Sequence, residues 1–161
     1  YRLKLPQGEK RTVGGEFSLH KRNIDQIDYS FNVSLSLVEN KYTNGNWYKD
    51  RHDIPISFKS QFGILVGKAH RFSLGLFYSM GRPVNEFNND ITGVYHTDRF
   101  KPTFLINFRY SFSHQFHRTR FSAYLELINI LNQRHIIYKD WGDIDYKLNG
   151  FLPVGGIKIE F

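Results

Sequence analysis

The chain has 161 residues, enough for one domain, and it contains no cysteine, which excludes disulfide bridges and thiolate metal sites. Its 22 Lys and Arg outnumber its 15 Asp and Glu, and the formal charge of +7 is compatible with nucleic acid, lipopolysaccharide or an anionic ligand as a partner. Mean hydropathy is −0.46, and no apolar run approaches the roughly 18 residues that indicate a membrane helix. A membrane barrel stays compatible with such a value, because its strands alternate between apolar and polar residues.

Apolar side chains recur at every second position along most of the chain, from Phe17 and Leu19 to Ile157, Ile159 and Phe161. Such alternation is typical of strands with one apolar face, and no stretch of comparable length has a helical period. In chain order, the predicted strands cover residues 16–22, 29–40, 56–67, 71–81, 103–112, 120–131 and 152–161. The sequence therefore predicts an all-β, antiparallel protein.

The second face of these strands carries small, polar and charged side chains. They include Glu16, His20, Asn32, Lys59, Gln61, Asn107, Arg109, Glu126, Lys158 and Glu160. A soluble sandwich would bury the apolar face, whereas a membrane barrel would turn it to lipid and turn the polar face to a wet lumen. The alternating runs extend over roughly 10–16 residues, longer than the about 5–6 of globular strands, and aromatic residues gather near their ends. We therefore predict a transmembrane barrel in which these polar residues face the lumen.

The connections between the predicted strands alternate in length. Residues 23–27, 68–70 and 113–118 are short turns, whereas residues 41–53, 82–101 and 141–152 are long and rich in Asn, Gly, Asp and aromatics. In membrane barrels the short turns are periplasmic and the long loops extracellular, which gives seven strands if residues 135–140 extend the 120–131 strand past a bend. Bacterial barrels have even strand numbers, and the chain opens with neither a signal peptide nor a start site. We expect an incomplete barrel.

Motifs occur in order along the chain at GGEFSLHKR (14–22), YSFNVSL (29–35), DRHDI (50–54), GRP (81–83), AYLELINILN (123–132) and LPVGGIKIEF (152–161). Together they resemble the barrel strands of TonB-dependent receptors of the Gram-negative outer membrane. Segment 123–132 is the most telling, because it is similar to the family's LxLxNLFN segment in the penultimate strand. The last segment resembles the C-terminal signal, here ending in Phe161, that the barrel-insertion machinery reads.

The resemblance implies a 22-stranded barrel around an N-terminal plug that imports a scarce ligand, such as a ferric siderophore or another metal chelate, with energy relayed by TonB. Residues 1–161 would be the C-terminal part of this barrel domain, without the plug and earlier strands. The implied partners are outer-membrane lipid and lipopolysaccharide, the plug, TonB, the insertion machinery and the ligand. The C-terminus would be periplasmic. The alternative is a self-contained small barrel or sandwich that acts as a binding or adhesion module.

Catalysis has little support in the sequence, because no nucleophile motif such as GxSxG occurs, and no cofactor is expected. The carboxylates of Glu16, Glu126 and Glu160 are expected to be solvated lumen charges. His114 and His117 have an i, i+3 spacing, but no third ligand lies nearby, so we predict no metal site. The basic residues are spread over both ends of the strands, which does not favour nucleic acid.

The long loops are where ligand specificity would lie. An aromatic and basic funnel for an anionic or aromatic iron chelate would be formed by Trp47, Tyr48, Arg51, His52, Phe87, Tyr95, Arg99 and Trp141. In the alternative interpretation the Trp and Tyr residues form the interfacial girdle, and the charges are merely solvated.

Overall fold

A computed structural model describes residues 8–22, 26–42, 46–84, 98–139 and 145–161. Seven long strands follow one another in the sheet. They are β1 (Gly8–Arg22), β2 (Ile27–Tyr42), β4 (Ile56–Val66), β5 (His70–Ser79), β6 (Thr103–Phe116), β7 (Thr119–Ile128) and β10 (Leu152–Glu160). The short strand β3 (Tyr48–Lys49) pairs with the loop end of β2. The prediction of an all-β, antiparallel protein is thus confirmed, and the seven predicted strands correspond to the seven long ones; the sequence did not predict β3, which is the eighth strand of the sheet among the described residues.

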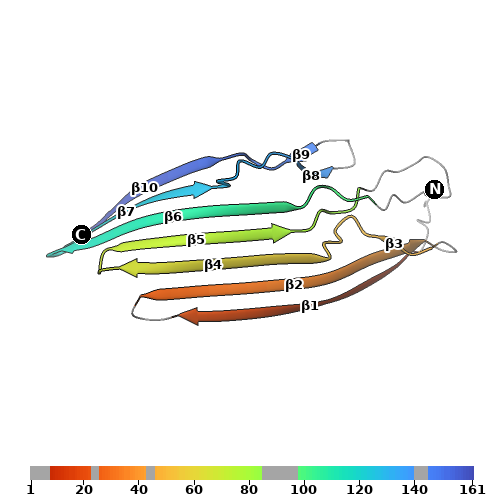
Figure 1. The fold of residues 1–161 in the computed structure, drawn as a ribbon, viewed down its shortest axis with the longest axis horizontal. Helices are drawn as coiled ribbons and strands as arrows, with labels where there is room; N and C mark the ends of the chain where they lie inside the picture. The colour runs from red at the N-terminus through yellow and green to blue at the C-terminus, as the bar shows by residue number, and fades with distance from the viewer. Residues whose placement is uncertain (1–7, 23–25, 43–45, 85–97, 140–144) are drawn as a thin grey trace, which may run out of the picture.

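The sheet is antiparallel throughout, and its order is β1-β2-β4-β5-β6-β7-β10. Each strand therefore pairs with the long strands that precede and follow it in the chain, as expected where hairpins connect them. Figure 1 shows the strands side by side in one twisted layer, with β1 and β10 at its two edges. Among the described residues these two edges do not meet, so this sheet is open.

Tight turns and long connections lie at opposite ends of the sheet, and the C-terminus lies at the end with the tight turns (Figure 1). Gly67, at φ 64°, lies in the turn after β4, where the left-handed backbone favours glycine. The turn between β6 and β7 contains only His117 and Arg118, since Phe116 pairs with Thr119. The predicted turn at 113–118 was therefore too long, because β6 continues to Phe116.

Residues 135–140 were expected to extend the penultimate strand. After β7, the chain turns at Asn129 and Asn132, both of which have left-handed φ angles near 50°. The Gln133 side chain accepts a hydrogen bond from the backbone N–H of Phe104, so the chain still runs beside β6. The strand β8 (Ile136–Lys139), however, pairs with β9 (Asp145–Lys147) in a separate two-stranded sheet. The expected extension is wrong in this respect, because the turn redirects the pairing.

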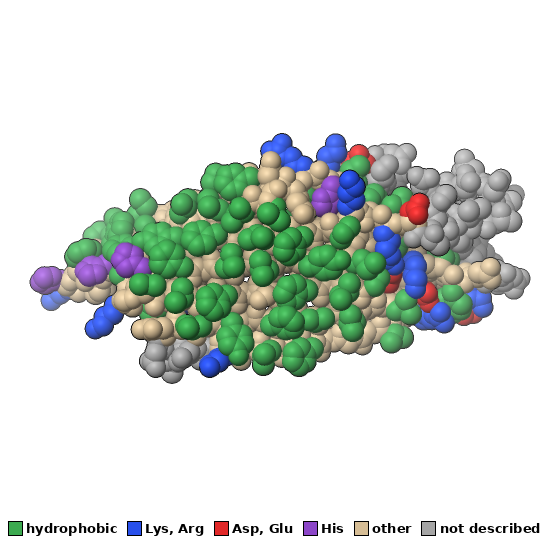
Figure 2. Space-filling view, viewed as in Figure 1, with side chains coloured by type: hydrophobic (Ala, Val, Ile, Leu, Met, Phe, Trp, Pro, Cys, Tyr) green, Lys and Arg blue, Asp and Glu red, His purple; other side chains and the backbone are tan. Residues whose placement is uncertain are grey.

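Apart from Pro83 in the β5–β6 connection, no apolar side chain is buried in the part of the chain that the structure describes. The alternating apolar residues form one continuous face of the sheet, which Figure 2 shows with Lys and Arg gathered towards its two ends. Representative residues are far from covered: Phe17 is 60% exposed, Leu35 53% and Ile157 74%. Exposed apolar area on this scale marks an interaction surface, because contact with water is unfavourable. Among these residues, no helix is long and apolar enough to cross a membrane.

Candidate functional site

The residues predicted to line a lumen share one face of the sheet. Residues directly opposite in an antiparallel pair point to the same side, and the register pairs Asn32 with Lys59 and Arg109 with Glu126. Gln61 and Asn107 flank Gly75 from its two sides in one such row. The same registers put on this polar face the side chains of Glu16, Asn32, Lys59, Gln61, Asn107, Arg109, Glu126 and Lys158.

Ion pairs cross the polar face between strands, either neighbouring ones or two that flank a third. The Arg71 Nη2 atom lies 2.6 Å from Asp28 Oδ1, and the Arg109 Nη1 atom lies 3.5 Å from Glu126 Oε2. All four side chains are substantially exposed, so solvent screens each pair and limits its contribution to stability to about 1 kcal/mol or less. The pairs therefore set the charge pattern of this face more than they set its stability.

Glycines let long side chains lie flat against the polar face. A Cβ at Gly156 would come within 2.6 Å of the Tyr124 ring, so only glycine leaves room for that ring to cross β10. The Arg109 guanidinium in turn stacks 4.5 Å from the centre of the Tyr124 ring. This stack uses the flat face of the guanidinium and leaves its N–H edge available for other acceptors.

A groove of about 230 Å³ lies on the polar face above β5. Gly75 forms part of its floor, and the neighbouring rows contribute Gln61 and Asn107 as its sides. Two cations, Lys59 and Arg109, line it from different strands. The remaining residues that line it are Ser73, Phe77 and Glu126, together with Ser60, Leu76 and Phe108, whose side chains lie on the opposite face. Strand alternation had placed most of these residues on the polar face, but only the register shows that they surround one glycine.

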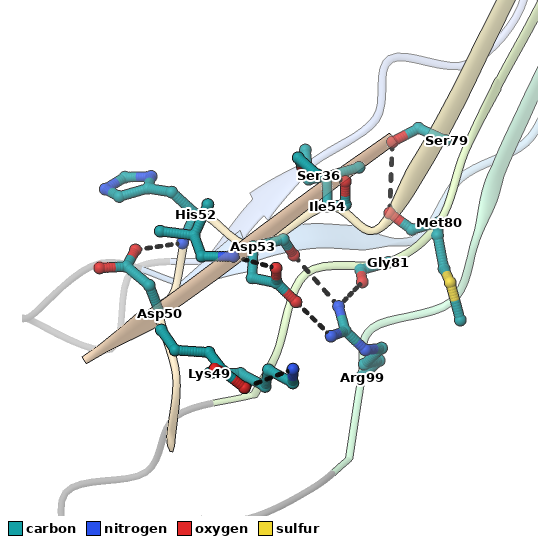
Figure 3. Close-up of polar contacts among 12 residues, drawn as sticks. Ser36, Lys49, Asp50, His52, Asp53, Ile54, Ser79, Met80, Gly81 and Arg99 are labelled. Atoms are coloured by element: carbon teal, nitrogen blue, oxygen red, sulfur yellow. Dashed lines mark hydrogen bonds and ion pairs between the residues drawn. The ribbon is translucent and has the colours of Figure 1, made fainter. Parts of the chain in front are cut away.

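A buried ion pair joins two of the long connections at the other end of the sheet. Asp53 is fully buried, and its Oδ2 accepts a hydrogen bond of 2.5 Å from Arg99 Nη2 (Figure 3). The Arg99 Nη1 atom also donates to the backbone carbonyls of Asp53 and Gly81. Asp53 Oδ1 accepts the backbone N–H of Val38, which ties the pair to β2. Gly81 has no room for a side chain, because a Cβ would overlap the Phe100 carbonyl.

Asp50 forms a second polar centre beside this pair. Its carboxylate accepts hydrogen bonds from the backbone N–H of His52, from Asn40 Nδ2 and from Lys10 Nζ. Burial raises the pKa of Asp50, but these hydrogen bonds outweigh it, and the pKa lies below the ordinary value. The carboxylate is therefore held in its charged form as an acceptor for three chain segments.

The described loop residues that were predicted to bind a ligand make contacts with neighbouring groups of the protein. Trp47 stacks with the Arg11 guanidinium, at 4.3 Å from the ring centre, and Tyr48 lies in β3. Arg51 donates to His52 Nε2, and Figure 3 shows the His52 ring pointing away from the Asp53–Arg99 pair. Arg99 is held by Asp53 and two carbonyls, a scaffold role that sequence reasoning missed. The predicted residues Phe87, Tyr95 and Trp141 lie outside the described residues, and the ligand role of all of them stays a prediction.

Asn129 is the most buried polar residue of the turn after β7, at 1% exposure. Its side-chain Nδ2 donates to the carbonyls of Gln133 and Asn149, and its Oδ1 accepts the backbone N–H of Gln133. Its own backbone N–H donates to Asn107 Oδ1. Asn129 thereby connects the β7–β8 turn, the segment before β10 and a residue that lines the groove.

In the described ranges, no group of three or more His, Asp or Glu side chains is arranged to hold a metal ion. No protein-family model, curated protein or solved structure matches the chain.

Proposed function

We propose that the chain forms part of the wall of an outer-membrane transporter barrel, with its apolar face against lipid and its polar face towards the lumen. The observation that carries the proposal is a two-faced sheet in which no described apolar side chain is buried. Exposure of an apolar face of this extent to water is unfavourable, so another apolar surface or lipid must cover it. The ion pairs, amides and glycines of the opposite face suit a wet interior.

The height of the apolar face supports lipid as its cover. On β2 the outward apolar residues run from Ile27 to Leu37, and the next outward residue is Glu39. Ten residue steps of about 3.4 Å span about 34 Å along the strand, which a tilt of 35–45° reduces to about 24–28 Å. The apolar band of membrane barrels is about 25 Å tall. The apolar core of a soluble sandwich is not constrained to this height, because no bilayer sets it.

Polar and aromatic groups border the apolar face at both ends, as expected for a membrane interface. At the turn end, the His70 Nδ1 atom lies 2.8 Å from the Tyr110 hydroxyl, and the His114 ring packs against Phe116 with centroids 4.3 Å apart. At the loop end, Arg11 and Lys49 both ion-pair with Glu39. These borders suit phospholipid headgroups on one side and lipopolysaccharide on the other.

An open sheet with one wet and one lipid face requires more strands to close it, since unpaired edges have no partner within a bilayer. We propose that those strands belong to a barrel of the TonB-dependent receptor type, which these motifs resemble. In this proposal a plug and TonB act on the barrel, and the imported ligand is a siderophore or another metal chelate. The segment itself makes and breaks no bonds, so no enzyme activity is proposed.

Spin labelling tests the membrane part of the proposal. The chain lacks cysteine, so Phe62→Cys and Gln61→Cys each introduce a single label site within it. In bilayers, the label at position 62 should collide with oxygen, which concentrates in lipid, and the label at position 61 should collide with a water-soluble nickel chelate. In the alternative adhesion or sandwich module, a label at position 62 would be shielded from both reagents. That outcome would reject lipid exposure.

Uptake measurements test the transport part. A Gram-negative host that produces the full-length protein should gain uptake of an iron chelate, and the gain should vanish when TonB is removed. Lipid exposure without TonB-dependent uptake would keep the barrel and reject the transporter. The spin-label experiment and the uptake experiment can therefore reject the membrane location and the transport activity independently.

A further inference from the structure

We propose that the groove above Gly75 binds a small molecule with carboxylate groups at both ends. The proposal rests on the proposed function only in that the groove then lies on the lumen wall, where a small solute can reach it. Lys59 on β4 and Arg109 on β6 lie on opposite sides of Gly75, two strands and four residues apart in register. These offsets separate their Cα atoms by about 16 Å. Both residues line the groove.

The chemistry of the lining favours an acceptor-rich ligand. Within the described residues Lys59 has no ion-pair partner, so its ammonium can serve a bound anion. Arg109 contacts Glu126 at the long distance of 3.5 Å. Its stacking on Tyr124 uses the flat face of the guanidinium and leaves N–H groups available to a ligand. Asn107 Oδ1 already accepts the Asn129 N–H, so the amide of Asn107 offers its N–H₂ donors.

The shape of the groove sets the size of the ligand. Gly75 carries no side chain, and Ser73 on the same strand is small, which leaves a polar floor between the two cations. Phe77, on the polar face, adds an apolar side chain to the lining. A volume of about 230 Å³ suits a ligand of modest size. A short hydrocarbon chain with a carboxylate at each end matches the two cations and the apolar side chain together.

Titration calorimetry on the full-length protein in detergent tests the proposal, with linear dicarboxylates from succinate to suberate as probes. At least one dicarboxylate should bind with one-to-one stoichiometry, and hexanoate, with a single carboxylate, should bind more weakly. Lys59→Gln and Arg109→Gln should each weaken binding about threefold to tenfold. Lys158→Gln is the matched control, because Lys158 is a polar-face cation already paired with Glu160 outside the groove.

Three further variants separate shape from charge. Gly75→Leu fills the groove while keeping both cations, and there is room for its Cβ, which would lie 3.7 Å from Asn107 Cβ. It should abolish binding, whereas Gly15→Leu, where no atom lies within 4 Å of a Cβ, should leave binding unchanged. Glu126→Gln removes the carboxylate that competes for Arg109 and should tighten binding.

Absence of binding by every dicarboxylate would overturn the proposal. Binding that survives Gly75→Leu, or that falls equally in Lys158→Gln, would also overturn it, because the anion would then sit elsewhere. The spin-label result is independent of these outcomes. A lipid-exposed apolar face without dicarboxylate binding would reject the groove alone, and groove binding by a protein with no lipid-exposed face would reject the membrane function alone.

Discussion

An arginine in the middle of the apolar face should destabilise the protein in a bilayer, and the structure allows the size of the effect to be worked out. Phe62 is 44% exposed on the apolar face of β4, one residue from the centre of the Ile56–Val66 strand. This offset places it about 3 Å along the strand from the midplane of the apolar band. Arginine facing lipid at the midplane of a membrane barrel costs about 2–4 kcal/mol. We therefore expect Phe62→Arg to lose about 2–4 kcal/mol of unfolding free energy.

The assay is reversible urea unfolding of the full-length protein in phospholipid vesicles, followed by tryptophan fluorescence. Two controls isolate the cause. Gln61→Arg adds the same charge one residue away on the polar face and should cost less than about 1 kcal/mol. Val66→Arg adds it at the turn end of the apolar face, where the cost should fall to about 0–1 kcal/mol. Equal losses for Phe62→Arg and Gln61→Arg, or no decrease from position 62 to position 66, would refute lipid exposure of this face.

Three further outcomes follow from the polar contacts. Asp53→Ala leaves the Arg99 guanidinium without its buried carboxylate and should lower the unfolding free energy, measured in urea, by about 3–5 kcal/mol. The double variant Asp53→Ala with Arg99→Met should lose much less unfolding free energy than the sum of the two single losses. Asn129→Ala removes three side-chain hydrogen bonds at a residue with a left-handed φ of 53°, and it should lower the unfolding free energy by about 2–4 kcal/mol. Asn129→Gly also removes the hydrogen bonds but avoids the backbone strain, so its loss should be about 1 kcal/mol smaller. Equal losses for the two variants would exclude a contribution from strain. The pKa of Asp50 is lowered in the folded state, so its carboxylate stabilises the fold above the unfolded pKa and loses this contribution as pH falls through the folded pKa. The difference in unfolding free energy between the native protein and Asp50→Asn should therefore narrow below about pH 4. A difference that stays constant with pH would contradict the role of the charged carboxylate.

The two faces of the sheet could be predicted from the sequence, since alternation determines the side to which each residue points once a strand forms. Phe62 and Gln61 are adjacent in the chain, and the structure places them on opposite faces as the pattern requires. The bend after β7 was also visible, at Asn129 and Asn132. The partner of the following segment was not, because pairing between β8 and β9 depends on chain segments that local patterns do not connect.

The polar contacts at the loop end show where sequence reasoning stopped. Arg99 was predicted to bind a ligand because basic residues in long loops often do. In the structure Arg99 binds Asp53, which is 46 residues away in the chain and whose carboxylate is fully buried. Nothing local in either segment specifies this pairing, since it depends on the position of the β5–β6 connection beside the β2–β4 connection.

The sequence by itself determined the long antiparallel strands and the face of each of their side chains, because these follow from a local period of two residues and from turn length. The tertiary structure decided the register, and with it which distant residues meet. A shift of two residues between β5 and β6 would keep every side chain on its face, yet it would move Asn107 away from Gly75 and remove the groove. The faces are therefore a property of each strand, whereas the groove and the Asp53–Arg99 pair are properties of the assembled sheet.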